Sequence, residues 1–246
     1  MWRVGLKNSA SFLKPMKALK IIKIAIDAAM FILFVLLMGQ HLTVAAHEWM
    51  GLAVFMLFIL HNALNYKWYT VLFKGRYTPM RIAQTAVNLL LIVVMIICLV
   101  SSVLISVDVF AFLNLSGSLV GRTLHLVTTA WAFVLMSVHL GLHWSTFVAM
   151  AKRIKGSLLC KRIIKWILRI TVLAVCAFGV YVFIERAFYE ELFYLTAFKA
   201  LDYDKTVFVY LLESVALSVL FSSIVYYTKK FILYARRKNR EVKQNA

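Results

Sequence analysis

The residues of this sequence that can do chemistry are histidines, and four of them form two matching pairs. His47 and His61 are 14 residues apart, and so are His125 and His139. Fourteen residues turn an α-helix through about 1400°, roughly 40° short of four full turns, and advance it by about 21 Å. Both histidines of a pair therefore face the same side of a helix. In a hydrocarbon core about 30 Å thick, one of them lies toward each membrane face.

The composition supplies the helices that such pairs require. Of the 246 residues, 63% are hydrophobic and 15% are charged. A soluble domain is about half apolar, and here the apolar residues also lie in long blocks. The fold class predicted is all-α integral membrane, with six transmembrane helices over residues 19–41, 46–65, 81–107, 121–148, 162–185 and 207–232.

The second and fourth predicted helices run in the same direction, because the third lies between them in the chain. His47 is then level with His125 on the outer side, and His61 with His139 on the inner side. Two facing imidazoles can hold a haem iron from opposite sides, and helix bundles build cofactor sites from inward-facing side chains. The absence of C-x-x-C-H excludes covalent attachment of a c-type haem, so the pattern predicts two haem b groups.

Other roles remain open for single histidines and their neighbours. A histidine in a membrane also forms interhelical hydrogen bonds. His139 and His143 have the i, i+4 spacing of a zinc pair, although His143 is interpreted here as lying at a haem edge or replacing His139 as ligand. His41 could contact a haem propionate or a quinone, or be a plain interfacial residue. Arg122 could bind a propionate or anchor the helix at the interface.

Two acids lie within predicted spans. Asp27 is costly in a membrane unless it is paired or protonated, so we expect it to pair with a nearby lysine or to carry a proton. A role in quinone protonation is the alternative. The same expectation applies to Glu213.

The net charge of +18 lies mainly in the short links between apolar blocks, which argues against nucleic-acid binding. With the N-terminus inside, 24 of the 28 basic residues fall on the inner side. The positive-inside rule then predicts a multi-pass chain in the cytoplasmic membrane, with both termini in the cytoplasm. The first apolar block lacks a small-residue cleavage site and is expected to be a membrane helix.

Several segments resemble the bacterial flavinylation-associated membrane cytochromes, a family long catalogued as a domain of unknown function. They are His47-Glu48-Trp49-Met50-Gly51, Phe58-Ile59-Leu60-His61-Asn62, Leu64-Asn65-Tyr66-Lys67-Trp68-Tyr69, Lys74-Gly75-Arg76-Tyr77-Thr78 and the run from Leu135 to Trp144. The resemblance covers residues 19–148 best. It implies a haem-bearing subunit that passes electrons from a quinol or a cytoplasmic reductase to a flavinylated protein outside the cytoplasm. The ligand pattern also resembles the bundle of respiratory cytochrome b.

The function predicted is b-type di-haem electron transfer across the membrane, as a subunit that could belong to a quinol- or flavin-linked oxidoreductase complex. Residues 1–18 form a cytoplasmic segment, 19–148 the di-haem four-helix bundle, and 149–246 a C-terminal helix pair with a basic tail. The rival hypotheses are a proton or metal-ion transporter that uses the membrane histidines, and a structural membrane anchor. Both predict a colourless protein.

Overall fold

The computed structural model describes residues 9–39, 42–115, 117–154, 162–196 and 205–244. Within these ranges the chain forms helices and no strands. The elements are α1 (Ser9–Leu37), α2 (Val44–Leu64), α3 (Lys67–Thr70), α4 (Pro79–Ile105), the 3₁₀ turn η1 (Ala111–Leu113), α5 (Leu119–Ile154), α6 (Arg162–Glu185), α7 (Phe188–Phe193) and α8 (Val207–Gln244).

Five helices are long and apolar enough to cross a membrane. They are α2, α4, α5 over Leu119–Thr146, α6, and α8 over Val207–Lys238. Each overlaps one predicted span, so these five helices are confirmed as helices of spanning length and composition. Many of their large apolar side chains are exposed, as expected where lipid is the solvent.

The first predicted span, 19–41, is the exception. It lies in α1, which ends at Leu37 and carries Lys20, Lys23 and Asp27 in the stretch that would have to cross. These three ionisable residues separate α1 from the five other long helices, whose best stretches hold at most two. Six spans therefore remain a prediction.

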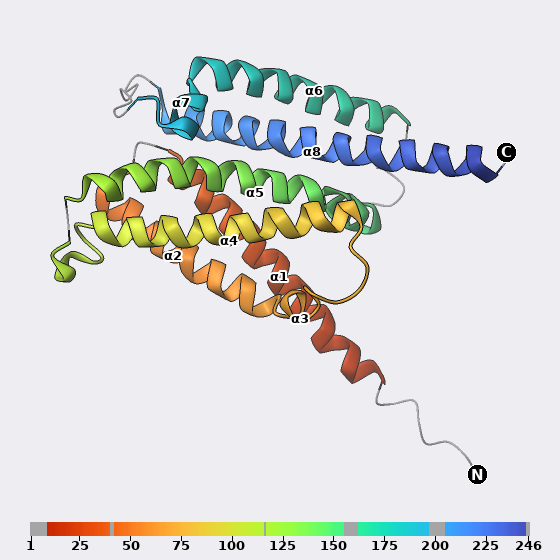
Figure 1. Ribbon diagram of the computed structural model, residues 1–246, viewed down its shortest axis with the longest axis horizontal. Coiled ribbons are helices and arrows are strands. Elements are labelled where there is room, and N and C mark those ends of the chain that lie inside the picture. The colour runs from red at the N-terminus through yellow and green to blue at the C-terminus, as the bar shows by residue number, and fades with distance from the viewer. Residues whose placement is uncertain (1–8, 40–41, 116, 155–161, 197–204, 245–246) are drawn as a thin grey trace, which may run out of the picture. The chain divides into compact units, whose positions relative to one another are not determined.

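The described chain divides into two compact units, Met1–Gly75 and Arg76–Ala246. In the first unit α1 packs along α2, and α3 follows α2 (Figure 1). Thr43 caps the start of α2, since its Oγ1 accepts a hydrogen bond from the backbone N–H of Ala46 at 3.3 Å. A hydroxyl at this position satisfies one of the backbone donors that the first turn leaves open.

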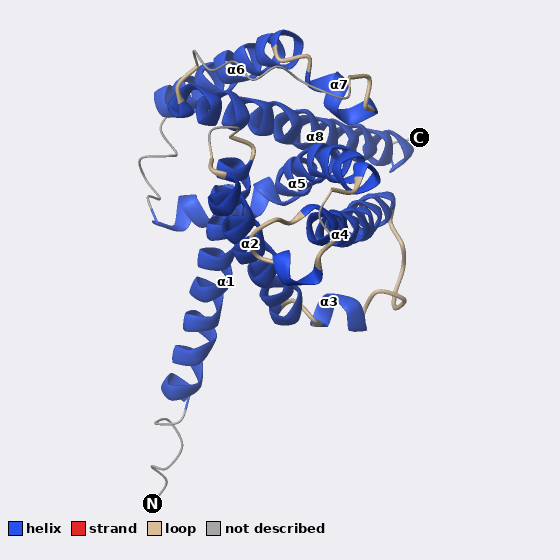
Figure 2. Ribbon diagram, turned by 90° about the vertical axis from the view of Figure 1, so that its left-hand side faces the viewer, coloured by secondary structure: helices blue, strands red, loops and turns tan. Residues whose placement is uncertain are grey.

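In the second unit α5 has neighbours on two sides. It packs against α4 and against α8, and α8 in turn packs against α6, so that the four helices lie in a row (Figures 1 and 2). The contact between α5 and α8 is very close. A Cβ atom added at Gly141 would lie only 2.5 Å from the carbonyl oxygen of Ser222. Small residues permit this approach, as is usual between helices in membranes.

Serines complete the contact between α5 and α8. Ser137 Oγ lies 3.0 Å from Ser218 Oγ, and Ser222 Oγ donates to the carbonyl of Ser137 at 2.7 Å. Ser137 and Ser218 are almost fully buried. Lys229 Nζ also donates to the carbonyl of Leu142 at 2.7 Å, which fixes α8 beside α5 further along.

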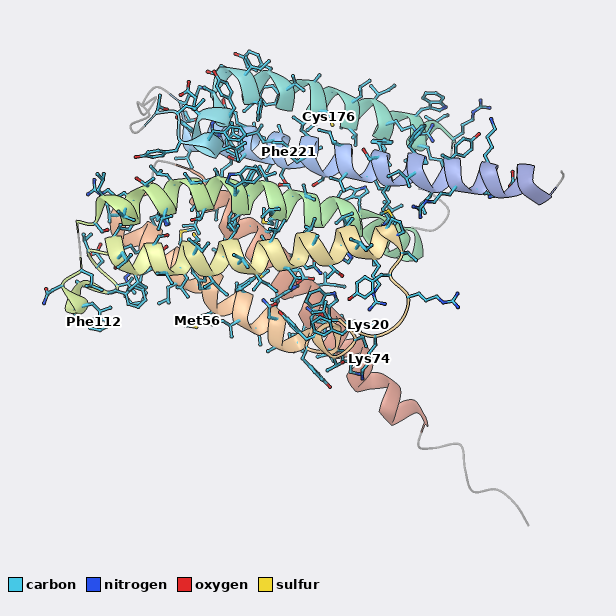
Figure 3. All side chains as sticks on the ribbon, viewed as in Figure 1. Lys20, Met56, Lys74, Phe112, Cys176 and Phe221 are labelled. Atoms are coloured by element: carbon cyan, nitrogen blue, oxygen red, sulfur yellow. The ribbon has the colours of Figure 1, made fainter. Side chains whose placement is uncertain are left out.

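The described part of the segment between α6 and α8 forms the short helix α7, and the ring of Phe188 is fully buried. Phe188 meets Phe133 of α5, Phe183 of α6 and Phe221 of α8 in an aromatic cluster (Figure 3 labels Phe221). This cluster holds one end of the second unit together.

Candidate functional site

Four of the six histidines on which the sequence argument rests lie on two unbroken helices. His47 and His61 both belong to α2, whereas His125 and His139 both belong to α5. All four are partly buried, and none is exposed. His41 lies outside the described residues. Because α2 and α5 belong to different units, each half of the candidate haem site is described separately, and the predicted pairing between the halves stays a prediction.

In the first unit His61 is bound by an acid. Its Nδ1 lies 2.6 Å from Oδ1 of Asp27 on α1. The expectation that Asp27 pairs with a lysine is therefore wrong. Lys23, one turn earlier on α1, donates instead to the carbonyl of Leu64 at 2.7 Å and to Oδ1 of Asn65 at 2.9 Å. Lys23 and Asp27 of α1 thus both form polar contacts with the end of α2 that carries His61.

Asn65 closes this cluster. Its Nδ2 donates to the carbonyl of His61 at 2.9 Å. The last turn of α2 leaves backbone carbonyls without helical partners, and Lys23 satisfies that of Leu64. The His61 carbonyl accepts twice from Asn65, since the backbone N–H of Asn65 also donates to it at 3.1 Å. The backbone and the ring of His61 are therefore both held by neighbouring polar groups, which fixes the direction of the imidazole.

In the second unit His125 is held by a serine of α4. Its Nδ1 lies 3.1 Å from Ser102 Oγ. Ser102 donates its one hydroxyl hydrogen to the carbonyl of Cys98 at 2.7 Å, so toward His125 it can only accept. The proton of a neutral His125 is then on Nδ1, and its lone pair is on Nε2. The Cys98 sulfur lies further away, at 4.0 Å from the same Nδ1.

The arrangement at His139 is the same with a different partner. Its Nδ1 lies 2.9 Å from Oδ1 of Asn88 on α4. An amide oxygen is an acceptor, so Nδ1 again carries the proton. His143 lies one turn further along α5, and the centroids of the two rings are 4.7 Å apart. Either ring could serve a ligand at this level, as the sequence suggested.

Three of the four predicted ligands thus share one pattern: His61, His125 and His139 each direct Nδ1 at an acceptor. A metal-binding histidine almost always donates its other ring N–H in this way, which fixes the tautomer and the ring orientation. The lone pair of each neutral ring then lies on Nε2, the nitrogen that could bind an iron. The residues present therefore fit axial ligation of haem.

The surroundings of His47 fit as well. Gly51 lies one turn after His47 on α2, and a Cβ atom added at Gly51 would meet no described atom within 4 Å. Room beside the backbone at this position suits a flat macrocycle. Arg122 lies in the first turn of α5, one turn before His125, and its side chain is exposed. It is available to an anionic group at that end of the helix.

Glu213 belongs to a separate ion cluster at the start of α8. Its carboxylate is buried and lies 3.1 Å from Lys205 and 3.8 Å from Arg186, and Lys205 also binds Glu185 at 2.8 Å. Burial by itself lowers the pKa of Lys205, but the hydrogen bonds to Glu185 and Glu213 outweigh it and raise that pKa. Glu213 therefore pairs with a lysine, which was the first of the two alternatives expected for it.

The partners of the histidines on α4, Asn88 and Ser102, were not predicted from the sequence. Asn88 and Ser102 lie in the most apolar helix of the chain. A polar side chain in such a helix needs a partner inside the protein, and this rule could have linked both residues to the histidines of α5.

Across the described ranges, no group of three or more histidine, cysteine or acidic side chains is arranged to hold a bare metal ion. A haem iron asks for only two protein ligands. No protein-family model, no curated protein and no solved structure matches this chain.

Proposed function

We propose that this protein is a b-type di-haem membrane cytochrome that carries electrons from one face of the membrane to the other. The observation that carries the proposal is the hydrogen-bonding pattern that His61, His125 and His139 share. Each ring has Nδ1 beside an acceptor, at 2.6, 3.1 and 2.9 Å respectively. Interhelical hydrogen bonds alone would not require all three rings to use the same nitrogen, whereas ligation through Nε2 does.

The ligand sets follow from the spacing along α2 and α5. His47 and His125 hold the outer haem, and His61 and His139 hold the inner one, with His143 at the inner edge. When bound, the haem irons supply reversible one-electron chemistry between the ferric and ferrous states. The protein contributes the ligands, their hydrogen bonds and a dry surrounding, which together set the potentials. Arg122 is the cation available for an outer propionate.

The membrane arrangement belongs to the same proposal. The charge distribution calls for an even number of spans with both termini in the cytoplasm, so α1 is the sixth span. Two of its three charged residues have partners on α2, since Asp27 pairs with His61 and Lys23 donates to the end of that helix. The membrane is the cytoplasmic membrane of a bacterium. A quinol or a cytoplasmic reductase donates electrons, and a flavinylated protein outside accepts them.

The test is a haem count. The protein would be produced in haem-supplied bacterial membranes, purified, and measured by reduced-minus-oxidised spectra and pyridine haemochrome. We expect a b-type spectrum and about two haems per chain, set by two bis-histidine sites. His61→Ala should retain only the outer haem. A folded but colourless wild-type protein would refute the proposal.

His143→Ala is the matched control for the ligand assignment, because the two rings of His139 and His143 are neighbours on one helix. We expect His143→Ala to keep both haems and His139→Ala to lose the inner one. The opposite result would make His143 the inner ligand and leave the electron-transfer function unchanged.

One observation favours a second candidate, a proton-coupled transporter. A carboxylate and an imidazole 2.6 Å apart, as in Asp27 and His61, can pass a proton between them. This candidate predicts proton uptake into vesicles by a colourless protein, and loss of that uptake in Asp27→Asn. The spectrum of the wild-type protein separates the two candidates directly.

A further inference from the structure

The partners of the three histidines differ in kind, although the pattern is shared. His61 faces a carboxylate at 2.6 Å, His139 an amide oxygen at 2.9 Å and His125 a hydroxyl at 3.1 Å. The ring with the strongest acceptor and the shortest contact therefore belongs to the inner ligand pair. The outer ligand His125 has the weakest acceptor, because Ser102 Oγ already gives its hydrogen to Cys98.

The acceptor on Nδ1 controls how strongly Nε2 donates to a metal. A carboxylate draws the Nδ1 proton toward itself and leaves the ring with more negative charge, whereas a hydroxyl does so much less. A more basic axial ligand favours the ferric over the ferrous state. It therefore lowers the reduction potential of the iron that it holds.

We propose that Asp27 is a positioning residue that lowers the reduction potential of the inner haem, the one that His61 helps to hold. This inference rests on the proposed function. With haem bound, a reductant of the quinol or reduced-flavin class would supply one electron at the inner side, and a flavin would take up one electron at the outer side.

The arrangement of α1 supports a role for Asp27 beyond joining two helices. Lys23 already provides a charged contact with the end of α2, through Leu64 and Asn65. Asp27 lies one turn further along α1, and His61 is the partner that its carboxylate contacts. The helix thus brings a negative charge to the ring of the ligand itself.

The experiment is a redox titration that resolves the two haems in the full-length protein. For Asp27→Asn we expect a raised inner potential and an unchanged outer potential. The matched control is Lys23→Gln, which weakens the same helix contact without touching the imidazole and should leave both potentials unchanged. Ser102→Ala should move only the outer potential.

The outcomes separate cleanly. Two haems with unchanged potentials in Asp27→Asn would overturn the inference and leave the proposed function intact, whereas a colourless wild type would remove both. Loss of the inner haem alone from Asp27→Asn would support the positioning role. Equal loss of both haems from Asp27→Asn and Lys23→Gln would assign Asp27 to packing and overturn it.

Discussion

The two units join their helices by different means. In the first unit α1 meets α2 through charged and amide groups, namely Lys23 with Asn65 and Asp27 with His61. In the second unit the closest contact of α5 with α8 uses a glycine and three serines, with a backbone approach that leaves no room for a Cβ, and one lysine, Lys229, adds a bond to a backbone carbonyl further along. Close approach through small residues is the usual way in which membrane helices pack. Placing a carboxylate beside a histidine ring within a pair of membrane helices costs free energy, and ionisable residues kept there are by default candidates for a functional role.

The largest expected effect comes from filling the closest contact. Gly141→Leu would push a side chain into the backbone of Ser222, which cannot retreat as a flexible side chain would. Overpacking of this kind costs about 3 kcal/mol of unfolding free energy, at the upper end of the usual range. Thermal unfolding in detergent, followed by circular dichroism, measures the loss.

Gly51→Leu is the matched control for this prediction, because a Cβ at Gly51 meets no described atom within 4 Å. We expect little change in melting temperature but a lowered haem content, since the added side chain would occupy the space proposed for the macrocycle. Equal destabilisation by the two substitutions would remove the contrast between the units.

An intermediate effect is expected where the second unit does use charge. Lys205→Met would leave Glu185 and the buried Glu213 without their shared ammonium group. Leaving a buried acceptor unsatisfied costs about 1–3 kcal/mol. Lys205→Arg keeps the positive charge and should lose less. Melting temperatures near neutral pH measure both changes.

The same ion cluster predicts a pH dependence. The pKa of Lys205 is raised in the folded protein above its ordinary value of 10.5, because the hydrogen bonds to Glu185 and Glu213 outweigh burial. Its contribution to stability is therefore fully present below that ordinary value and is lost as the pH rises through the folded one. Lys205→Met should lack this alkaline loss. An identical alkaline profile in the variant would show that another group causes it.

The smallest expected effect concerns the serines. Ser218→Ala removes the partner of Ser137 Oγ but leaves Ser137 able to bond the carbonyl of Phe133. A hydrogen bond between membrane helices is worth about 0.6 kcal/mol on average. We expect a small fall in melting temperature and no change in the spectrum. A clear spectral change would mean that the α5–α8 contact also shapes the cofactor site.

Most of the helical architecture could be predicted from the sequence, because a run of apolar residues must form a helix to satisfy its backbone within a membrane. The five long apolar helices and the places of His47, His61, His125 and His139 on two of them follow from this rule. Whether α1 spans the membrane was harder to predict, because Lys20, Lys23 and Asp27 interrupt its apolar run.

The partners of the histidines could not be predicted with the same ease. Hydropathy gives the length of a helix but not its rotation about its own axis, and rotation decides whether Asn88 or Ser102 faces a histidine. Asp27 was expected to pair with a lysine, the commoner partner for an acid. It contacts the imidazole of His61 instead, while the nearby Lys23 donates to the end of α2.

The length of α8 has a mechanical consequence. It is an unbroken helix of 38 residues, and at about 1.5 Å per residue it extends roughly 57 Å. A hydrocarbon core is only about 30 Å thick. The helix is thus longer than a simple span requires, and Lys229 holds it to α5 through the carbonyl of Leu142. One continuous helix therefore joins its basic last turns to α5, the helix that carries His125 and His139.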